Sequence, residues 1–193
     1  MDIKQFNSIE LNPATAYITG LCFPLYKTIS ILHKPYIVGS VNHNSNMINS
    51  SDLAEHYNSV QKLINMNFGT GKIKLLSNQN DEQNISSKKG FSVLIEKNGE
   101  DDTECLKILG EISAKILASP TEIRKEFVKG CFDGRSSWDT TAHYLSLDVD
   151  RDYSRQDLIV KIIESLGIGI NINRRDINHP KNDQIRIKKD SRY

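Results

Sequence analysis

The stretch FVKGCFDGRSS, residues 127–137, and its shorter counterpart AYITGLCF, residues 16–23, decide how this chain folds. In each stretch a glycine, Gly20 or Gly130, lies in the last turns of an apolar run that is typical of a helix. Glycine inside a helix costs roughly 1 kcal/mol relative to alanine, so its presence indicates a close approach between two backbones. We therefore predict that two helices pack against each other through Gly20 and Gly130.

The two stretches belong to an internal repeat. Each is followed by strand-like segments, an amphipathic helix that ends at glycine, and further strand-like segments. Because the two glycines are 110 residues apart, the repetition predicts two related units, residues 1–110 and 111–193. The expected fold class is α+β, with two αββαββ-like halves that pack through their first helices.

Local signals bound the expected helices. Asn12 followed by Pro13 is a typical helix start, and Pro24 ends that helix. A capping box from Ser119 to Glu122 predicts the start of the helix that runs to about residue 134. Further helices are expected over 51–69 and 154–167, and strands over 26–32, 35–42, 72–76, 91–97, 141–149, 168–175 and 184–188.

Composition excludes several classes of protein. Of the 193 residues, 38% are hydrophobic and 25% are charged, unlike a highly charged disordered chain. No apolar run approaches the roughly 18 residues of a membrane-spanning helix, and the N-terminus lacks the pattern of a signal peptide. The three cysteines are widely spaced and form no zinc motif. We therefore expect a cytoplasmic protein that does not interact with membranes.

The repeated stretches resemble the LAGLIDADG family of homing endonucleases and their relatives. Residues 127–137 are similar to the family's second motif, in which an apolar helix ends in glycine, two apolar residues, an aspartate, a small residue, an acid and a closing glycine. Residues 16–23 are a weaker copy. The resemblance implies a single-chain, pseudo-dimeric monomer, in which the motif helices join the halves and two antiparallel sheets form a saddle over DNA.

The resemblance also implies a site for a divalent metal, usually magnesium, held by an acid at the foot of each motif helix. Aligned without gaps, that acid falls at Leu25 and Arg135, and neither side chain supplies the oxygen that magnesium requires. The nearest acids in the second half are Asp133 and Asp139, and the first half has none close to Leu25. Ordinary two-metal cleavage is therefore not expected, and Asp133 and Asp139 are the catalytic candidates if the chain is a magnesium-dependent DNA endonuclease.

The C-terminal segment is the clearest basic stretch of the chain. Residues 174–193 contain seven Lys or Arg and three Asp, whereas the whole chain has a net charge of +1. Asn and Arg make bidentate contacts with base edges, and Lys suits phosphates. A solvated sheet face and a core-filling tryptophan are the alternatives for these residues. The candidate DNA-binding residues are Arg135, Trp138, Asn171, Asn173, Arg174, Arg175, Arg186 and Lys188.

Three functions are open at this point. The first is recognition of double-stranded DNA by a degenerate LAGLIDADG-type protein, which needs neither a metal nor a small-molecule cofactor. The second is a sequence-specific DNA endonuclease of a mobile element or defence system, with rearranged metal ligands. The third is a small interaction protein without a DNA role, for which an apolar sheet surface is expected.

Overall fold

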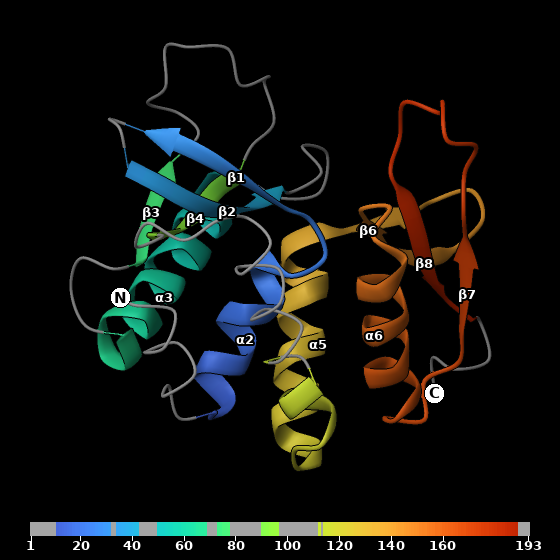
Figure 1. The fold of residues 1–193 in the computed structure, drawn as a ribbon, viewed down its shortest axis with the longest axis horizontal. Coiled ribbons are helices and arrows are strands. Elements are labelled where there is room, and N and C mark those ends of the chain that lie inside the picture. The colour runs from blue at the N-terminus through green and yellow to red at the C-terminus, as the bar shows by residue number, and fades with distance from the viewer. Residues whose placement is uncertain are drawn as a thin grey trace.

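The computed structural model describes residues 11–31, 34–42, 50–68, 73–77, 90–96, 112 and 114–188. Two helices, α2 (Pro13–Cys22) and α5 (Thr121–Arg135), lie side by side at the centre of the molecule (Figure 1). The helix α3 (Ser50–Phe68) packs on the far side of α2, and α6 (Tyr153–Glu164) packs against α5. None of the described helices is long and apolar enough to cross a membrane.

Each central helix is followed by the strands of a four-stranded antiparallel sheet. The strand order is β1-β2-β4-β3 in the first sheet and β5-β6-β8-β7 in the second, so the same order occurs twice. The predicted α+β class and the repeated order of elements are confirmed. The strands are β1 (Tyr26–Ile31), β2 (Lys34–Asn42), β3 (Ile73–Ser77), β4 (Gly90–Glu96), β5 (Ser136–Asp139), β6 (Tyr144–Val149), β7 (Ile170–Asn173) and β8 (Asp183–Ile187).

The central helices approach closely because each presents a glycine to the backbone of the other. A Cβ atom on Gly20 would overlap the carbonyl oxygen of Phe127, and a Cβ atom on Gly130 would overlap that of Tyr17. The prediction that the helices pack through these two glycines is confirmed. Around this contact lies one apolar core that both halves share, in which the rings of Phe23 and Phe127 meet edge to face with centroids 5.6 Å apart.

The helix α2 begins as predicted, whereas α5 does not. Asn12 caps α2, since its side chain accepts a hydrogen bond from the N–H of Thr15 at 3.0 Å. The expected capping box of α5 does not form, because the N-cap residue is Pro120, which offers no capping side chain. The hydroxyl of Ser119 instead donates to the carbonyl of Lys115 at 2.7 Å, so it serves the helical turn before α5.

Two further elements differ from the prediction. The N-cap of α6 is Asp152 rather than Ser154, because the Asp152 carboxylate accepts from the N–H of Arg155 at 3.1 Å. The strand expected over 141–149 begins only at Tyr144, since residues 140–143 form a turn in which His143 has a φ of 53°. Strand β5 is absent from the prediction. The turn that the sequence predicts near His33 and Lys34 lies only partly within the described residues, since Lys34 begins β2. The helix end at Gly69 and the polar stretch 78–89, which the sequence predicts to be a loop, lie outside them.

Candidate nucleic-acid interface

The second sheet, β5-β6-β8-β7, has one face on the core and one face turned away from the helices. Leu147, Ile170 and Ile185 are buried and belong to the apolar core, so their positions define the helix side. Residues that alternate with them point to the opposite side, which we call the outer face. Directly paired positions place one outer row at Ser137, Ser146, Arg186 and Asn171, and the next row at Asp148, Gln184 and Asn173.

Polar side chains on the outer face are linked both across strands and along β8. Gln184 donates to the Asp148 carboxylate at 3.0 Å, and Arg186 donates to the Gln184 side-chain oxygen at 3.1 Å. The Arg186 guanidinium also lies 4.5 Å from the ring centroid of Tyr144. These contacts hold the Arg186 guanidinium against an amide and a ring, and its charge also helps to lower the pKa of the Asp139 carboxyl. The alternation of residues 143–149 could have revealed Tyr144 and Asp148, whereas their partners could not be predicted.

The candidate DNA-binding residues are divided between the two sides of the sheet. Asn171 and Lys188 are exposed, and Asn173 and Arg186 are half-buried, and all four belong to the outer face. Trp138 instead pairs with Leu145 in a row on the helix side, where it is half-buried and does not belong to the apolar core, so the alternative of a core-filling tryptophan is not confirmed.

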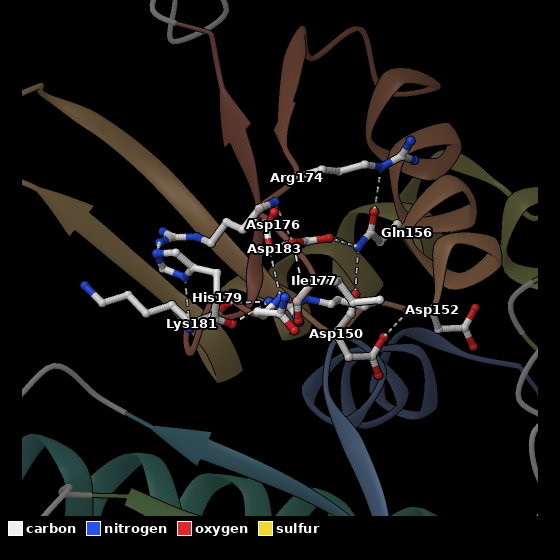
Figure 2. Close-up of polar contacts among 12 residues, drawn as sticks. Asp150, Asp152, Gln156, Arg174, Asp176, Ile177, His179, Lys181 and Asp183 are labelled. Carbon is white, nitrogen blue, oxygen red and sulfur yellow. Dashed lines mark hydrogen bonds and ion pairs between the residues drawn. The ribbon is translucent and has the colours of Figure 1, made fainter.

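The neighbouring arginines Arg174 and Arg175 are used differently. Arg174 reaches the helix side, where its Nε lies 3.3 Å from the Gln156 side-chain oxygen of α6 (Figure 2). Arg175 belongs to the loop between β7 and β8, and its N–H donates to the buried Asp183 carboxylate at 2.9 Å. Arg174 is therefore held by α6, while the backbone of Arg175 is held by Asp183 at the start of β8.

The positions at the feet of the two central helices carry no metal-ligand oxygen. Leu25 follows α2, and Arg135 is the last residue of α5. If the antiparallel pairing of β5 with β6 is continued by one residue beyond Ser136 and Leu147, Arg135 lies opposite Asp148. Burial lowers the pKa of the Arg135 guanidinium, while the nearby Asp148 carboxylate raises it. A cation thus occupies this position, close to the outer face.

The two candidate catalytic aspartates are held by different partners and are not brought together. Asp133 accepts a hydrogen bond from the Tyr17 hydroxyl at 3.0 Å, on the side of α5 that faces α2 and α3. Asp139 ends β5, and its carboxylate accepts from the N–H groups of Thr141 and Ala142 at 2.9 and 2.8 Å. The hydrogen bond from Ala142 is the main reason why the pKa of Asp139 is lowered.

The structure does bring an acid close to Leu25, although from the other half of the chain. The N–H of Asp150 donates to the carbonyl of Pro24 at 3.0 Å. Its carboxylate pairs with Arg155, whose guanidinium lies 3.6 Å from the ring centroid of Tyr26. Burial raises the pKa of Asp150, and Arg155 opposes that shift. The sequence around Leu25 does not predict this acid, because Asp150 is brought to the Pro24 carbonyl only by the tertiary structure.

Chains of known structure share this architecture. A mesophilic variant of the homing endonuclease I-DmoI superposes with a TM-score of 0.57 at 13% identity, over 92% of this chain and 89% of that chain. Full-length DUF199/WhiA from Thermatoga maritima gives 0.55 at 10% identity, over 92% of this chain and 51% of its own. The N-terminal LAGLIDADG domain of DUF199/WhiA gives 0.53 at 12% identity, over 92% and 75%.

This chain has the LAGLIDADG fold. No protein-family model and no curated protein sequence matches it. The likeness is therefore one of structure, and the resemblance of residues 127–137 to the LAGLIDADG motif agrees with it.

Structures of this fold include I-DmoI in complex with DNA and Ca, and with DNA and Mn. The residues at the feet of α2 and α5 do not suit a divalent metal ion, because the Leu25 side chain is a hydrocarbon and the Arg135 side chain is itself a cation. Among the described residues, no group of three or more His, Cys, Asp and Glu side chains is arranged to hold a metal ion. Asp150, whose N–H donates to the Pro24 carbonyl beside Leu25, already pairs with Arg155.

Proposed function

We propose that this chain binds double-stranded DNA on the outer face of the second sheet and does not cut it by two-metal chemistry. The observation that carries the proposal is the outer face itself, where Arg186 and Lys188 lie with Asn171 and Asn173 on the side opposite the described helices α5 and α6. Cations suit phosphates, and amide side chains suit base edges.

The hairpin that carries part of this face is basic, while the neighbouring strand β6 adds the Asp148 carboxylate to the same face. The hairpin of residues 170–188 holds five Lys or Arg and two Asp, whereas the whole chain has a net charge of only +1. One of the two acids, Asp183, is fully buried and is engaged within the protein. The exposed part of the hairpin is therefore strongly positive, as a phosphate-binding surface requires.

The absence of cleavage is part of the proposal. Asp133 and Asp139 are committed to Tyr17 and to a turn, so neither is placed to hold an ion together with the other. Leu25 and Arg135 would take the positions of metal ligands. A guanidinium at Arg135 supplies a fixed positive charge for a phosphate, but it neither activates water nor protonates a leaving group at neutral pH.

We further propose that residues 1–110 and 111–193 are the two repeats of a single pseudo-dimeric chain. The same strand order in both sheets supports this division, as does the packing of α2 on α5 between them. The boundary at 110 and 111 lies outside the described residues.

Fluorescence anisotropy with a labelled random-sequence duplex tests the binding proposal across a range of KCl concentrations. The decisive variant combines Arg175→Gln, Arg186→Gln and Lys188→Gln. We expect weaker binding and a salt slope that is shallower by about 0.9 for each phosphate that the variant no longer neutralises, which is up to about 3 for the triple variant.

The matched control combines Arg124→Gln, Lys125→Gln and Lys161→Gln, which removes the same charge from the α5 and α6 surfaces. We expect the control to retain most of the affinity. Equal losses in both triple variants would show that net charge alone drives binding. A wild type that does not bind DNA at low salt would favour the interaction-protein alternative.

A further inference from the structure

The loop between β7 and β8, residues 174–182, is fastened by one arginine from outside the hairpin. Arg151 lies between β6 and α6, and its guanidinium donates to the carbonyl of Ile177 and, from Nη2, to those of His179 at 2.6 Å and Lys181 at 3.2 Å. Its Nε lies 3.9 Å from the Asp183 carboxylate, which is an ion-pair distance but too long for a hydrogen bond. The planar guanidinium of Arg151 therefore binds three backbone carbonyls of an irregular loop.

Burial and local hydrogen bonds do not explain the position of the loop beyond Arg175. Its one aliphatic side chain, Ile177, is 79% exposed, so burial in the core does not hold it. The bonds within the loop are local: the N–H of Asn178 donates to Asp176, and the N–H of Lys181 donates to the His179 ring at 3.1 Å. Such short-range bonds shape a turn without fixing its orientation to the sheet.

The base of the loop is anchored by a buried polar network. Asp183 is fully buried and accepts from the Arg175 N–H and from the Gln156 side chain, both at 2.9 Å. Gln156 in turn donates to the Asp150 carbonyl at 2.7 Å. Asp183 thus fixes where the loop begins, and Arg151 fixes its course beyond that point.

The fastened loop separates its basic side chains. Figure 2 shows Arg174 reaching toward Gln156 on α6, while His179 and Lys181 lie on the opposite side of the hairpin. The Arg175 guanidinium lies 3.5 Å from the His179 ring, and the backbone N–H of Lys181 donates to the same ring at 3.1 Å, so the three residues are neighbours. Lys181 is exposed beside this ring.

We propose that Arg151 is a positioning residue for DNA binding, which holds the β7–β8 loop so that Lys181, together with Arg175, meets a DNA phosphate. The inference rests on the proposed DNA-binding function and adds to it a residue that makes no contact with DNA. A loop fixed before binding loses less conformational freedom when the complex forms, and affinity rises accordingly.

The test separates charge from geometry with Arg151→Lys and Arg151→Gln. Lysine keeps the charge, but its single nitrogen cannot occupy both positions of the fork. We expect both variants to bind a random-sequence duplex about 3- to 10-fold more weakly, since neither side chain can hold all three carbonyls. Hydrogen exchange of the free protein should accelerate at residues 177–182 while α6 remains protected. Arg124→Lys is the matched control and should change neither measurement.

A double-mutant cycle with Lys181→Gln provides the second measurement. If Arg151 acts through the placement of Lys181, the combined variant loses less affinity than the product of the two single losses. Wild-type affinity in Arg151→Lys, unchanged hydrogen exchange of the loop, or fully multiplicative losses would each overturn the inference while the DNA-binding proposal stands. A wild type that does not bind the duplex would overturn both.

Discussion

At Gly20, Gly130 and Gly134 the side chain is a single hydrogen atom because the opposing helix occupies the space that a Cβ would need. The first two face backbone carbonyls that a methyl group would overlap, whereas a Cβ on Gly134 would lie 2.9 Å from the Leu21 carbonyl oxygen. Backbone atoms of a packed helix cannot rotate away as a side chain can. The distances therefore predict that a Cβ is tolerated least at Gly20 and Gly130 and better at Gly134.

Alanine substitution should reveal that ranking. In an exposed helix, Gly→Ala stabilises by up to about 1 kcal/mol. Here we expect Gly20→Ala and Gly130→Ala to destabilise by about 1–3 kcal/mol, because overpacking forces the helices apart, and Gly134→Ala to cost less. Urea unfolding of the three variants measures the differences. Wild-type or greater stability in Gly20→Ala would contradict the close contact.

A second feature at this scale is the chain of hydrogen bonds through Tyr17. Its hydroxyl donates to Asp133 at 3.0 Å and lies 2.9 Å from the His56 Nε2, so the imidazole is the donor in that contact. Burial, followed by the Asp133 carboxylate, raises the pKa of Tyr17 above its ordinary range, which keeps the hydroxyl protonated. The contact joins α2 and α3 to α5.

The pH dependence of the free energy of unfolding should reveal the titration of His56. Burial is the main cause that lowers the pKa of His56 below 6.5, with Asp133 opposing the shift. Between the folded pKa and 6.5 the unfolded chain binds more protons than the folded chain, so stability falls as the pH drops through that window. We expect His56→Gln to remove this part of the pH dependence, as measured by urea unfolding from pH 7.5 to 5. A variant with the same slope as the wild type would contradict the assignment.

At the scale of elements, α6 is joined to the first half by one buried cation. Arg155 is 7% exposed, pairs with Asp150 and Asp152, and lies over the ring of Tyr26 at the start of β1. The N-cap of α6 is part of the same contact, because Asp152 also accepts from the Arg155 N–H. The start of α6 and the packing of the halves therefore depend on the same side chains.

Removing the cation should leave the half-buried Asp150 carboxylate without its partner. We expect Arg155→Ala to destabilise the fold by about 1–3 kcal/mol. Lys125→Ala is the control, since its pair with Glu122 is 57% and 74% exposed, and it should cost at most about 1 kcal/mol. Thermal or urea unfolding distinguishes the two. Equal costs would mean that the Arg155 contact contributes no more than a surface pair.

At the scale of the whole molecule, two halves meet along α2 and α5, and the feet of these helices carry Leu25 and Arg135. A tightly bound ion would stabilise the folded chain in proportion to the logarithm of its concentration. We expect MgCl₂ to leave the melting temperature unchanged relative to KCl of equal ionic strength, and EDTA to have no effect.

The corresponding activity measurement uses supercoiled and linear duplex DNA with Mg²⁺. We expect little or no cleavage. Cleavage that disappears in the Asp133→Asn, Asp139→Asn double variant would establish the nuclease alternative with these two residues as its acids. Cleavage that survives in the double variant would place an active site elsewhere on the chain.

Much of this architecture follows from local sequence. The two glycines in apolar helical runs predict the central contact, and alternation in residues 184–188 predicts which side chains of β8 leave the core. Strand β5 has no such signal, because Ser136–Asp139 is short and carries no apolar alternation. The start of α6 is ambiguous in the sequence because Asp152 and Ser154 are both good caps, and contacts with Arg155 choose between them.

The partners of the charged residues were decided only by the tertiary structure. The sequence by itself determined the repeat, the helix pair and the basic hairpin, since each depends on composition and period over a few residues. Nothing local indicates that Asp133 meets Tyr17, that Asp150 lies against Pro24, or that Arg151 gathers the carbonyls of a loop. These pairs join residues 26 to 126 positions apart, and only the packing of the elements brings them within reach of a hydrogen bond.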